Sequence, residues 1–293
     1  MSACFSKVKK VIQWRGFRYY KRTAVSLAYK IHGVMSDVPV IIIHGLLGSK
    51  KNWETMSKKI SVATNKAVIA VDMRNHGESP HTDSHTYPDL ASDVLELLNK
   101  LSISRTVIIG HSMGGRTGMV VALTKPDIVN SLIVVDISPI STPGTLSDYF
   151  PKLAKAMKTV NFKDSQNVYK ARNIAKEALV ASGAIDGDAV GFILMNIGVK
   201  EDKSLGWLCN IDVLEKYFPD IASFPNELNG KQYPGKTLFI GGENSRYLQA
   251  GDLSGIKNYF PAAELKYVQD AGHNVHADNP VAFFNLVKEF LIS

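Results

Sequence analysis

The chain has few cysteines and no long apolar run. Its 293 residues contain 2 cysteines, Cys4 and Cys209, which lie far apart and lack the spacing of a metal site. This excludes a disulfide-rich scaffold and fits a reducing or cysteine-poor compartment. No segment approaches the roughly 18 consecutive apolar residues that a transmembrane helix needs. Repeats and low-complexity tracts are also absent. We expect a large globular core, as one domain with an insertion or as two domains.

Acidic residues are missing from the start of the chain. Of the 34 lysine and arginine residues, eight lie in residues 1–36, and no acid precedes Asp37. The remaining 26 basic residues nearly balance the 27 acidic ones, so the net charge of +7 belongs to the N-terminal segment. A near-neutral body lacks the electrostatic footprint of a nucleic-acid-binding protein. No nucleic-acid partner is therefore expected.

The basic N-terminal segment, residues 1–23, permits two interpretations. Phe5, Val8 and Ile12 lie at helical spacing among lysines. This basic, acid-free, amphipathic pattern is typical of a mitochondrial transit peptide. The alternative is a basic arm on a cytoplasmic protein that touches an anionic membrane surface. We favour mitochondrial import.

Short apolar runs alternate with helical patterns along most of the chain. Strands are expected at residues 24–31, 40–43, 67–71, 106–109, 132–135, 237–240 and 264–268. Helices are expected at residues 53–60, 87–101, 116–123 and 281–292. Continuous apolar runs are typical of strands buried on both faces. The alternation predicts an α/β fold in which helices flank a mostly parallel central sheet.

The alternation stops between residues 141 and 235. This segment is expected to hold helices and no buried strand, with candidate helices at residues 147–159, 164–182, 187–197 and 211–218. It begins at the carboxyl edge of the sheet, where ligands bind in α/β proteins. We expect residues 24–140 and 236–293 to form the core and residues 141–235 to form a helical lid over the site. A surface insertion that only extends the fold is the alternative.

Residues 110–114 read Gly-His-Ser-Met-Gly, the G-x-S-x-G pattern of a nucleophile elbow. They follow an apolar strand and precede a helical pattern, which is the context that the elbow requires. A serine on such a turn has strained backbone dihedrals, so its neighbours must lack side chains, and Gly110 and Gly114 meet that need. Ser112 is the candidate nucleophile, beside a helix N-terminus that favours developing negative charge.

A serine hydroxyl needs an adjacent base to remove its proton. His273 is the candidate base, because it follows Gly272 in a loop after the last expected strand. His276 is the nearest rival, and a surface or supporting role is favoured for it. With an acid between them, the serine and the histidine follow the chain order of α/β-hydrolases.

Four further motifs accompany the elbow. They are HGLLGSKKNW at residues 44–53, DMRNHGESP at 72–80, VDISP at 135–139 and AGH at 271–273. With these motifs the chain resembles the α/β-hydrolase superfamily from about residue 24 to its end. Within it, the chain resembles the group of α/β-hydrolase domain-containing protein type eleven and its bacterial esterase relatives. The resemblance implies a carboxylic-ester or acylglycerol hydrolase, often mitochondrial in animals.

The sequence leaves the identity of the triad acid open, because the usual position for it does not hold an acid. In most members of the superfamily the acid ends a Gly-Glu-x-Asp pattern, but here that position is Ser245. We prefer Asp136, which ends the strand after the elbow and projects from the same sheet edge as Ser112. The resemblance supports this choice, because bacterial relatives show the same displacement of the acid. Ser245 would then donate a supporting hydrogen bond.

Other acids compete with Asp136 for this role. Asp212, after the lid helices, is the next choice, and a helix cap is its structural alternative. Glu243 and Asp252 are weaker candidates near the usual position.

Backbone N–H groups of Leu46 and Met113 are expected to form the oxyanion hole. Two other charged positions receive structural interpretations. Asp72 and Arg74 are expected to pair in a turn. Arg116 could bind an acidic substrate group, but a solvated residue in the first helical turn is favoured.

The sequence therefore predicts a serine hydrolase that cleaves carboxylic esters of acyl or acylglycerol type through an acyl-enzyme, without a metal or cofactor. A small-molecule ester or lipid is the expected partner. A thioesterase or amidase would need the same residues, and a binding protein on the same fold is the alternative from another class. Five apolar lid residues are expected either to line the pocket or to pack in a core: Tyr149, Phe150, Phe192, Ile193 and Met195.

Overall fold

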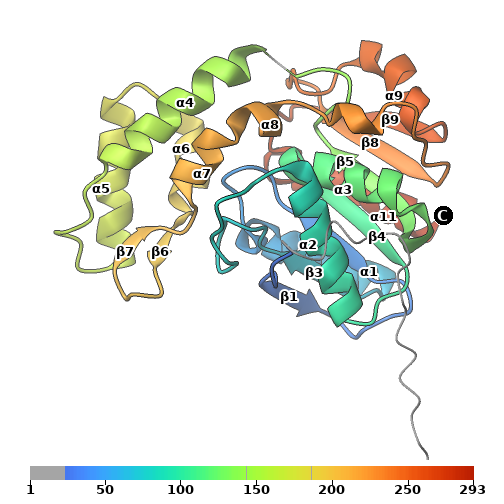
Figure 1. Ribbon diagram of the computed structural model, residues 1–293, viewed down its shortest axis with the longest axis horizontal. Coiled ribbons are helices and arrows are strands. Elements are labelled where there is room, and N and C mark those ends of the chain that lie inside the picture. Colours follow the sequence, from blue (N-terminus) through green and yellow to red (C-terminus); the bar gives the residue numbers. More distant parts are fainter. Residues whose placement is uncertain (1–23, 143, 186) are drawn as a thin grey trace, which may run out of the picture.

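The computed structural model describes residues 24–142, 144–185 and 187–293 (Figure 1). The expectations of mitochondrial targeting and membrane contact concern residues 1–23 and lie outside the described residues. None of the helices in the described part of the chain is both long enough and apolar enough to cross a membrane.

The central sheet has seven strands, in the spatial order β1-β3-β2-β4-β5-β8-β9. Their bounds are β1 Tyr29–His32, β2 Val40–Ile43, β3 Val68–Val71, β4 Thr106–His111, β5 Val129–Val135, β8 Thr237–Gly242 and β9 Ala263–Val268. Strand β1 runs antiparallel to β3, and the other neighbouring pairs are parallel. The mostly parallel sheet is as predicted, but β1 is shorter than expected. The N–H groups of Val25 and Ala28 bond to side chains instead, at Asp93 and Ser79.

Helices cover both faces of the sheet (Figure 1). On one face lie α1 Glu54–Thr64 and α11 Pro280–Ile292, and on the other lie α2 Tyr87–Lys100, α3 Met113–Thr124 and α9 Leu253–Tyr259. In β2, Val40 and Ile42 pack under α1 and α11, whereas Ile41 and Ile43 face the second layer. Both faces are thus buried, which explains the continuous apolar runs. Shorter helical segments lie at Lys50–Trp53, Pro126–Ile128, Asn226–Leu228, Ala250–Asp252 and Val275–Asp278 (α10).

An insertion joins β5 to β8 and projects beside the sheet (Figure 1). It contains α4 Gly144–Thr159, α5 Val168–Ala181, α6 Gly187–Leu194, β6 Ile197–Val199, β7 Leu205–Trp207, α7 Ile211–Lys216 and α8 Phe218–Ala222. The expectation of no buried strand is wrong, because β6 and β7 pair antiparallel and bury Ile197 and Trp207. The indole N–H of Trp207 also donates to the carbonyl of Met157 at 2.9 Å. Strands of three residues are too short to show a sequence period. Packing against α5 and the hydrogen bond from Trp207 to α4 hold them.

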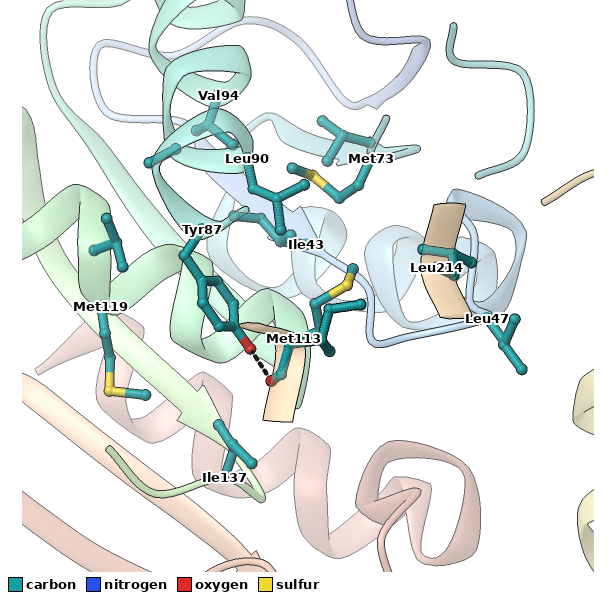
Figure 2. Packing of buried hydrophobic residues seen from close by; sticks show 14 of the residues in the cluster. Ile43, Leu47, Met73, Tyr87, Leu90, Val94, Met113, Met119, Ile137 and Leu214 are labelled. Carbon is teal, nitrogen blue, oxygen red and sulfur yellow. Dashed lines mark hydrogen bonds between the residues drawn. The ribbon is translucent and has the colours of Figure 1, made fainter. Parts of the chain in front are cut away.

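The insertion shares its apolar core with the sheet layer. Figure 2 shows Leu214 of α7 in the same cluster as Leu47, from the loop after β2, and Met113, the first residue of α3. The hydroxyl of Tyr87, in α2, donates to the carbonyl of Ile221 at 2.8 Å, as the dashed line in Figure 2 marks. The insertion is therefore anchored by buried apolar contacts and by a buried hydrogen bond.

Arg116 links the two ends of the insertion. Its side chain is buried and donates to the carbonyls of Ser138 at 3.0 Å and Ile221 at 3.1 Å. Ser138 precedes the insertion, and Ile221 lies in its last helix. The expectation of a solvated Arg116 is wrong, because the returning chain covers the start of α3 and supplies carbonyl acceptors.

Asp72 and Arg74 do not pair with each other as expected. The Asp72 carboxylate accepts from the backbone N–H of Lys50 at 2.7 Å and also forms an ion pair with the Lys50 ammonium. Arg74 donates from Nε to Asp93 of α2 at 2.6 Å. Both partners are distant in sequence and are brought near only by the packing of the helices on the sheet.

Candidate active site

Ser112 occupies a sharp turn between β4 and α3. Its dihedrals are φ 51° and ψ −118°, a strained conformation for a residue with a side chain. A Cβ atom on Gly110 would lie 2.2 Å from the carbonyl oxygen of Gly114, and one on Gly114 would lie 2.3 Å from that of Ile43. These approaches leave no room for a side chain at either glycine.

The structure brings Ser112, His273 and Asp136 together. The Nε2 atom of His273 lies 3.0 Å from Ser112 Oγ, and its Nδ1 atom lies 2.8 Å from Asp136 Oδ2. A neutral imidazole with its proton on Nδ1 donates to the carboxylate and accepts from the hydroxyl. This is the arrangement in which a base can remove the serine proton.

Asp136 is fully buried at the end of β5, with φ 51°. Its carboxylate accepts from the backbone N–H of Gly242 at 3.0 Å and from the hydroxyl of Ser245. Ser245, which occupies the position where most of the superfamily carries the acid, thus donates a hydrogen bond to Asp136. These donors compensate for the loss of water around a buried carboxylate.

The rival acids lie elsewhere. Asp212 is on the surface, 83% exposed, and pairs with Lys158 at 2.6 Å. It is not the cap of α7 either, since the side chain of Asn210 accepts from the helix N-terminus. Glu243 accepts from a backbone N–H of the turn before His273, and Asp252 accepts from Ser141 at 2.7 Å.

His276 is buried and not a surface residue, contrary to one expectation. Its ring stacks on Trp53 with centroids 4.0 Å apart, and its Nδ1 atom has no hydrogen-bond partner among the described residues. Burial lowers the pKa of His276 to about 3. The centroid of the His111 ring lies 5.1 Å from that of His276, so His276 packs beside the site.

Leu46 and Met113 line the same cavity as Ser112. Met113 is the first residue of α3, and Leu46 follows β2. Within the described part of the chain, neither backbone N–H donates a hydrogen bond to the protein. Among the described residues, both N–H groups therefore have no protein acceptor, and an oxyanion hole at these two positions stays a prediction.

An apolar cavity of about 260 Å³ opens beside Ser112. Its lining includes Leu46, Tyr87, Met113, Ile137, Tyr149, Phe150, Leu153, Phe192, Ile193 and Tyr247. Of the five lid residues considered from the sequence, four line the cavity, and Met195 does not. Its sulfur instead accepts from the side-chain amide of Asn52 at 3.3 Å.

Two residues at the site were missed by sequence reasoning. The ring of Tyr247 stacks on that of His273 with centroids 3.8 Å apart, and burial raises the pKa of Tyr247 to about 12. The Nε2 atom of His111 lies 2.8 Å from the carbonyl oxygen of His273 and holds that loop. His111 was visible inside the elbow motif, but only the fold shows that it faces the histidine loop.

Burial lowers the pKa of His111 well below its usual value. A neutral ring can donate from Nε2 to the His273 carbonyl without carrying a second positive charge beside the base. No group of three or more histidine, cysteine or acidic side chains in the described residues could hold a metal ion.

A family model described as "alpha/beta hydrolase fold" matches residues 38–280. The chain belongs to this family. A relative in Xenopus laevis, named sn-1-specific diacylglycerol lipase ABHD11, is 38% identical over 270 residues, which cover 92% of this chain and 85% of that protein. Esterase YbfF of Escherichia coli is 30% identical over 256 residues, 87% of this chain and 94% of its own length. The solved structure of a marine microorganism esterase matches with a TM-score of 0.80 and 33% identity, covering 91% of this chain and all of that one.

The comparisons confirm the predicted α/β-hydrolase fold and the resemblance from which it was drawn. They also show that the protein is a carboxylic ester hydrolase, because the relatives it matches at this identity and coverage are named as lipases and esterases.

Proposed function

We propose that this ester hydrolase removes an acyl chain from a diacylglycerol-like lipid, with Ser112 as nucleophile, His273 as base and Asp136 as acid. The observation that carries the proposal is the pair of contacts at His273, 3.0 Å to Ser112 Oγ and 2.8 Å to Asp136 Oδ2. The apolar cavity beside Ser112 supports an acyl chain as the bound group. The lipase named among the relatives supports the substrate class.

In the proposed mechanism each residue has a defined role. His273 takes the Ser112 proton on Nε2 while Oγ bonds to the ester carbonyl carbon, and the carbonyl electrons move to its oxygen. Backbone N–H groups of Leu46 and Met113 stabilise that oxyanion. His273 then gives its proton to the departing alcohol as the C–O bond breaks, which leaves an acyl-enzyme. Water repeats the cycle and releases the carboxylic acid.

The insertion contributes side chains to the cavity in which the acyl chain would bind. Phe150, Leu153 and Phe192, all from the insertion, lie on the same cavity as Ser112. We therefore propose that the insertion acts as the lid of this site, over residues 141–235, on a core of residues 24–140 and 236–293.

Hydrolysis of p-nitrophenyl esters from acetate to palmitate, by wild type and Ser112→Ala, tests the mechanism. We expect turnover to fall at least about 10³-fold in the variant. A 1,2-diacylglycerol with different chains at its two positions then tests the substrate, read by which fatty acid is released. Covalent labelling of Ser112 by a fluorophosphonate reports an activated serine independently of substrate choice.

Unchanged turnover in Ser112→Ala would refute the serine mechanism. Labelling of Ser112 without cleavage of any ester or diacylglycerol would instead indicate a thioester or amide substrate. Ligand binding with neither labelling nor turnover would support the binding-protein alternative.

For the segment 1–23 we propose mitochondrial import, supported by the eight basic residues of 1–36 and the absence of acids there. Fusion of residues 1–36 to a fluorescent protein tests this in animal or yeast cells. Uniform cytoplasmic fluorescence would contradict it. Recruitment of the fusion to anionic vesicles would then favour the alternative of a membrane-touching arm.

A further inference from the structure

The peptide groups of Leu47 lie next to the proposed oxyanion donor at Leu46. Leu47 has φ 58°, a left-handed conformation that costs free energy in a residue with a branched side chain. Such a conformation persists only where the surroundings hold it. Both polar groups of Leu47 are held by side chains distant in sequence, its N–H by His76 and its carbonyl by Asn196.

His76 contacts the loop as a hydrogen-bond acceptor. The N–H of Leu47 donates to His76 Nε2 at 3.1 Å, while His76 Nδ1 donates to the carbonyl of Arg74 at 3.0 Å. These two backbone partners fix the ring as the neutral tautomer with its proton on Nδ1. The side chain is fully buried, and its burial keeps the pKa of His76 well below the usual value.

Asn196 contacts the same residue from the insertion. Its side-chain amide donates to the carbonyl of Leu47, and Asn196 is 4% exposed. Asn196 lies between α6 and β6, and its own backbone is held on both sides. Its N–H donates to the carbonyl of Ile193, and its carbonyl accepts from the N–H of Leu208. Leu47 is thus held from the core on one side and from the insertion on the other.

We propose that His76 and Asn196 are positioning residues for the oxyanion hole. By fixing both polar groups of Leu47, they set the orientation of the preceding peptide and aim the N–H of Leu46 at the reacting carbonyl. The inference rests on the proposed function, in which that N–H stabilises the oxyanion. It further implies that the insertion takes part in organising the hole, through Asn196, and does not only enclose the acyl chain.

Four variants test the proposal. His76→Leu removes the acceptor, whereas His76→Gln keeps an oxygen near the position of Nε2. Asn196→Ala removes the donor from the insertion. The matched control is His32→Leu. It removes a buried imidazole from β1, at the far edge of the sheet, whose Nε2 lies 3.4 Å from Glu54 Oε2 and touches no part of the site.

The measurements are kcat and KM for p-nitrophenyl butyrate and the inhibition constant of an alkyl trifluoromethyl ketone. Ser112 Oγ adds to that ketone carbon, its proton passes to His273, and the resulting oxyanion occupies the hole. Loss of a direct oxyanion donor costs about 10²–10³-fold in kcat, so a misaimed donor should cost about tenfold or more.

We expect His76→Leu and Asn196→Ala to lower kcat about tenfold or more and to weaken the ketone by a similar factor. KM should stay within about twofold of wild type, because ground-state binding does not use the hole. His76→Gln should recover most of the loss, and His32→Leu should behave as wild type.

Wild-type kcat and ketone affinity in Asn196→Ala and His76→Leu would overturn the proposal. So would a loss that falls equally on KM, or no recovery by His76→Gln. If His76→Leu fails to fold, as judged by circular dichroism, Asn196→Ala decides the outcome. Absence of fluorophosphonate labelling of Ser112 in the wild type would instead refute the proposed function, and this inference with it.

Discussion

At the scale of single residues, the position of the proposed acid, Asp136, is the least conventional feature of the site. The position where most of the superfamily carries an aspartate is Ser245, and its hydroxyl donates to Asp136 on the neighbouring strand. Strands β5 and β8 are adjacent and parallel, so their carboxyl ends meet. An acid can move from one strand end to the other and still reach Nδ1 of His273.

The first prediction separates Asp136 from Ser245. Asp136→Asn should lower kcat about 10³–10⁴-fold, because an amide N–H facing His273 Nδ1 favours the wrong imidazole tautomer. Ser245→Ala should lower kcat less than about tenfold, because Gly242 still donates to the carboxylate. Steady-state kinetics on p-nitrophenyl butyrate measures both. Equal, small losses in the two variants would remove Asp136 from the triad.

At the scale of elements, the elbow depends on close approach of three backbone segments. A Cβ on Gly114 would lie 2.3 Å from the carbonyl oxygen of Ile43 and 2.5 Å from that of His44. Neither oxygen belongs to a flexible side chain, so the added atom can be accommodated only if a strand or helix moves.

The second prediction compares two glycines that lie in helices. Gly114→Ala should lower the free energy of unfolding by about 3 kcal/mol or more and abolish activity. Gly191→Ala, in α6, meets nothing within 4 Å and should stabilise the protein by about 0.5–1 kcal/mol through helix propensity. Urea denaturation of both variants checks the pair. A Gly114→Ala variant that is stable and active would contradict the prediction, because it would mean that the elbow can accommodate a Cβ atom at this position.

At the scale of the whole molecule, buried neutral histidines gather around the site. The rings of His44, His76 and His85 form one chain of neighbours, and His111 contacts His273 and His276 in another. Burial lowers the pKa of His85 and of His276 to about 3. These rings serve as fixed acceptors or packing groups, and none can take a proton without a cost.

The third prediction is a loss of stability in acid. A histidine whose folded pKa lies below its unfolded value of about 6.5 binds more protons when unfolded. Its contribution is therefore fully present above pH 6.5 and is lost as the pH falls from there toward 3. Each such histidine removes about 1.4 kcal/mol per pH unit within that window. Denaturant unfolding at pH 7.5, 6.5 and 5.5 should show a steep decline.

His276→Phe tests the cause of that decline. Phenylalanine keeps the stacking on Trp53 and removes the titrating group. The slope of unfolding free energy against pH should fall by about 1.4 kcal/mol per pH unit below pH 6. An unchanged slope would mean that His276 does not contribute and that other groups account for the acid sensitivity.

The sheet, the elbow and the chemical class could be predicted from the sequence alone. Apolar runs at β2 to β5 and β8 could be read directly, because burial on both faces leaves few polar positions. Ser112 and His273 could be named as candidates because their backbone settings, a glycine-flanked turn and a loop after the last strand, are local. The comparisons then confirmed the fold and the ester hydrolase class.

Contacts between groups distant in the sequence could not be predicted and became visible in the folded chain. Asp136 and Asp212 were both acceptable from sequence, and strand pairing placed one against His273 and left the other on the surface. The burial of Arg116 and the contact from Asn196 to Leu47 depend on how the insertion returns over the sheet. Contacts across such separations leave no period or motif in the sequence, because they are set by the packing of whole elements and not by neighbouring residues.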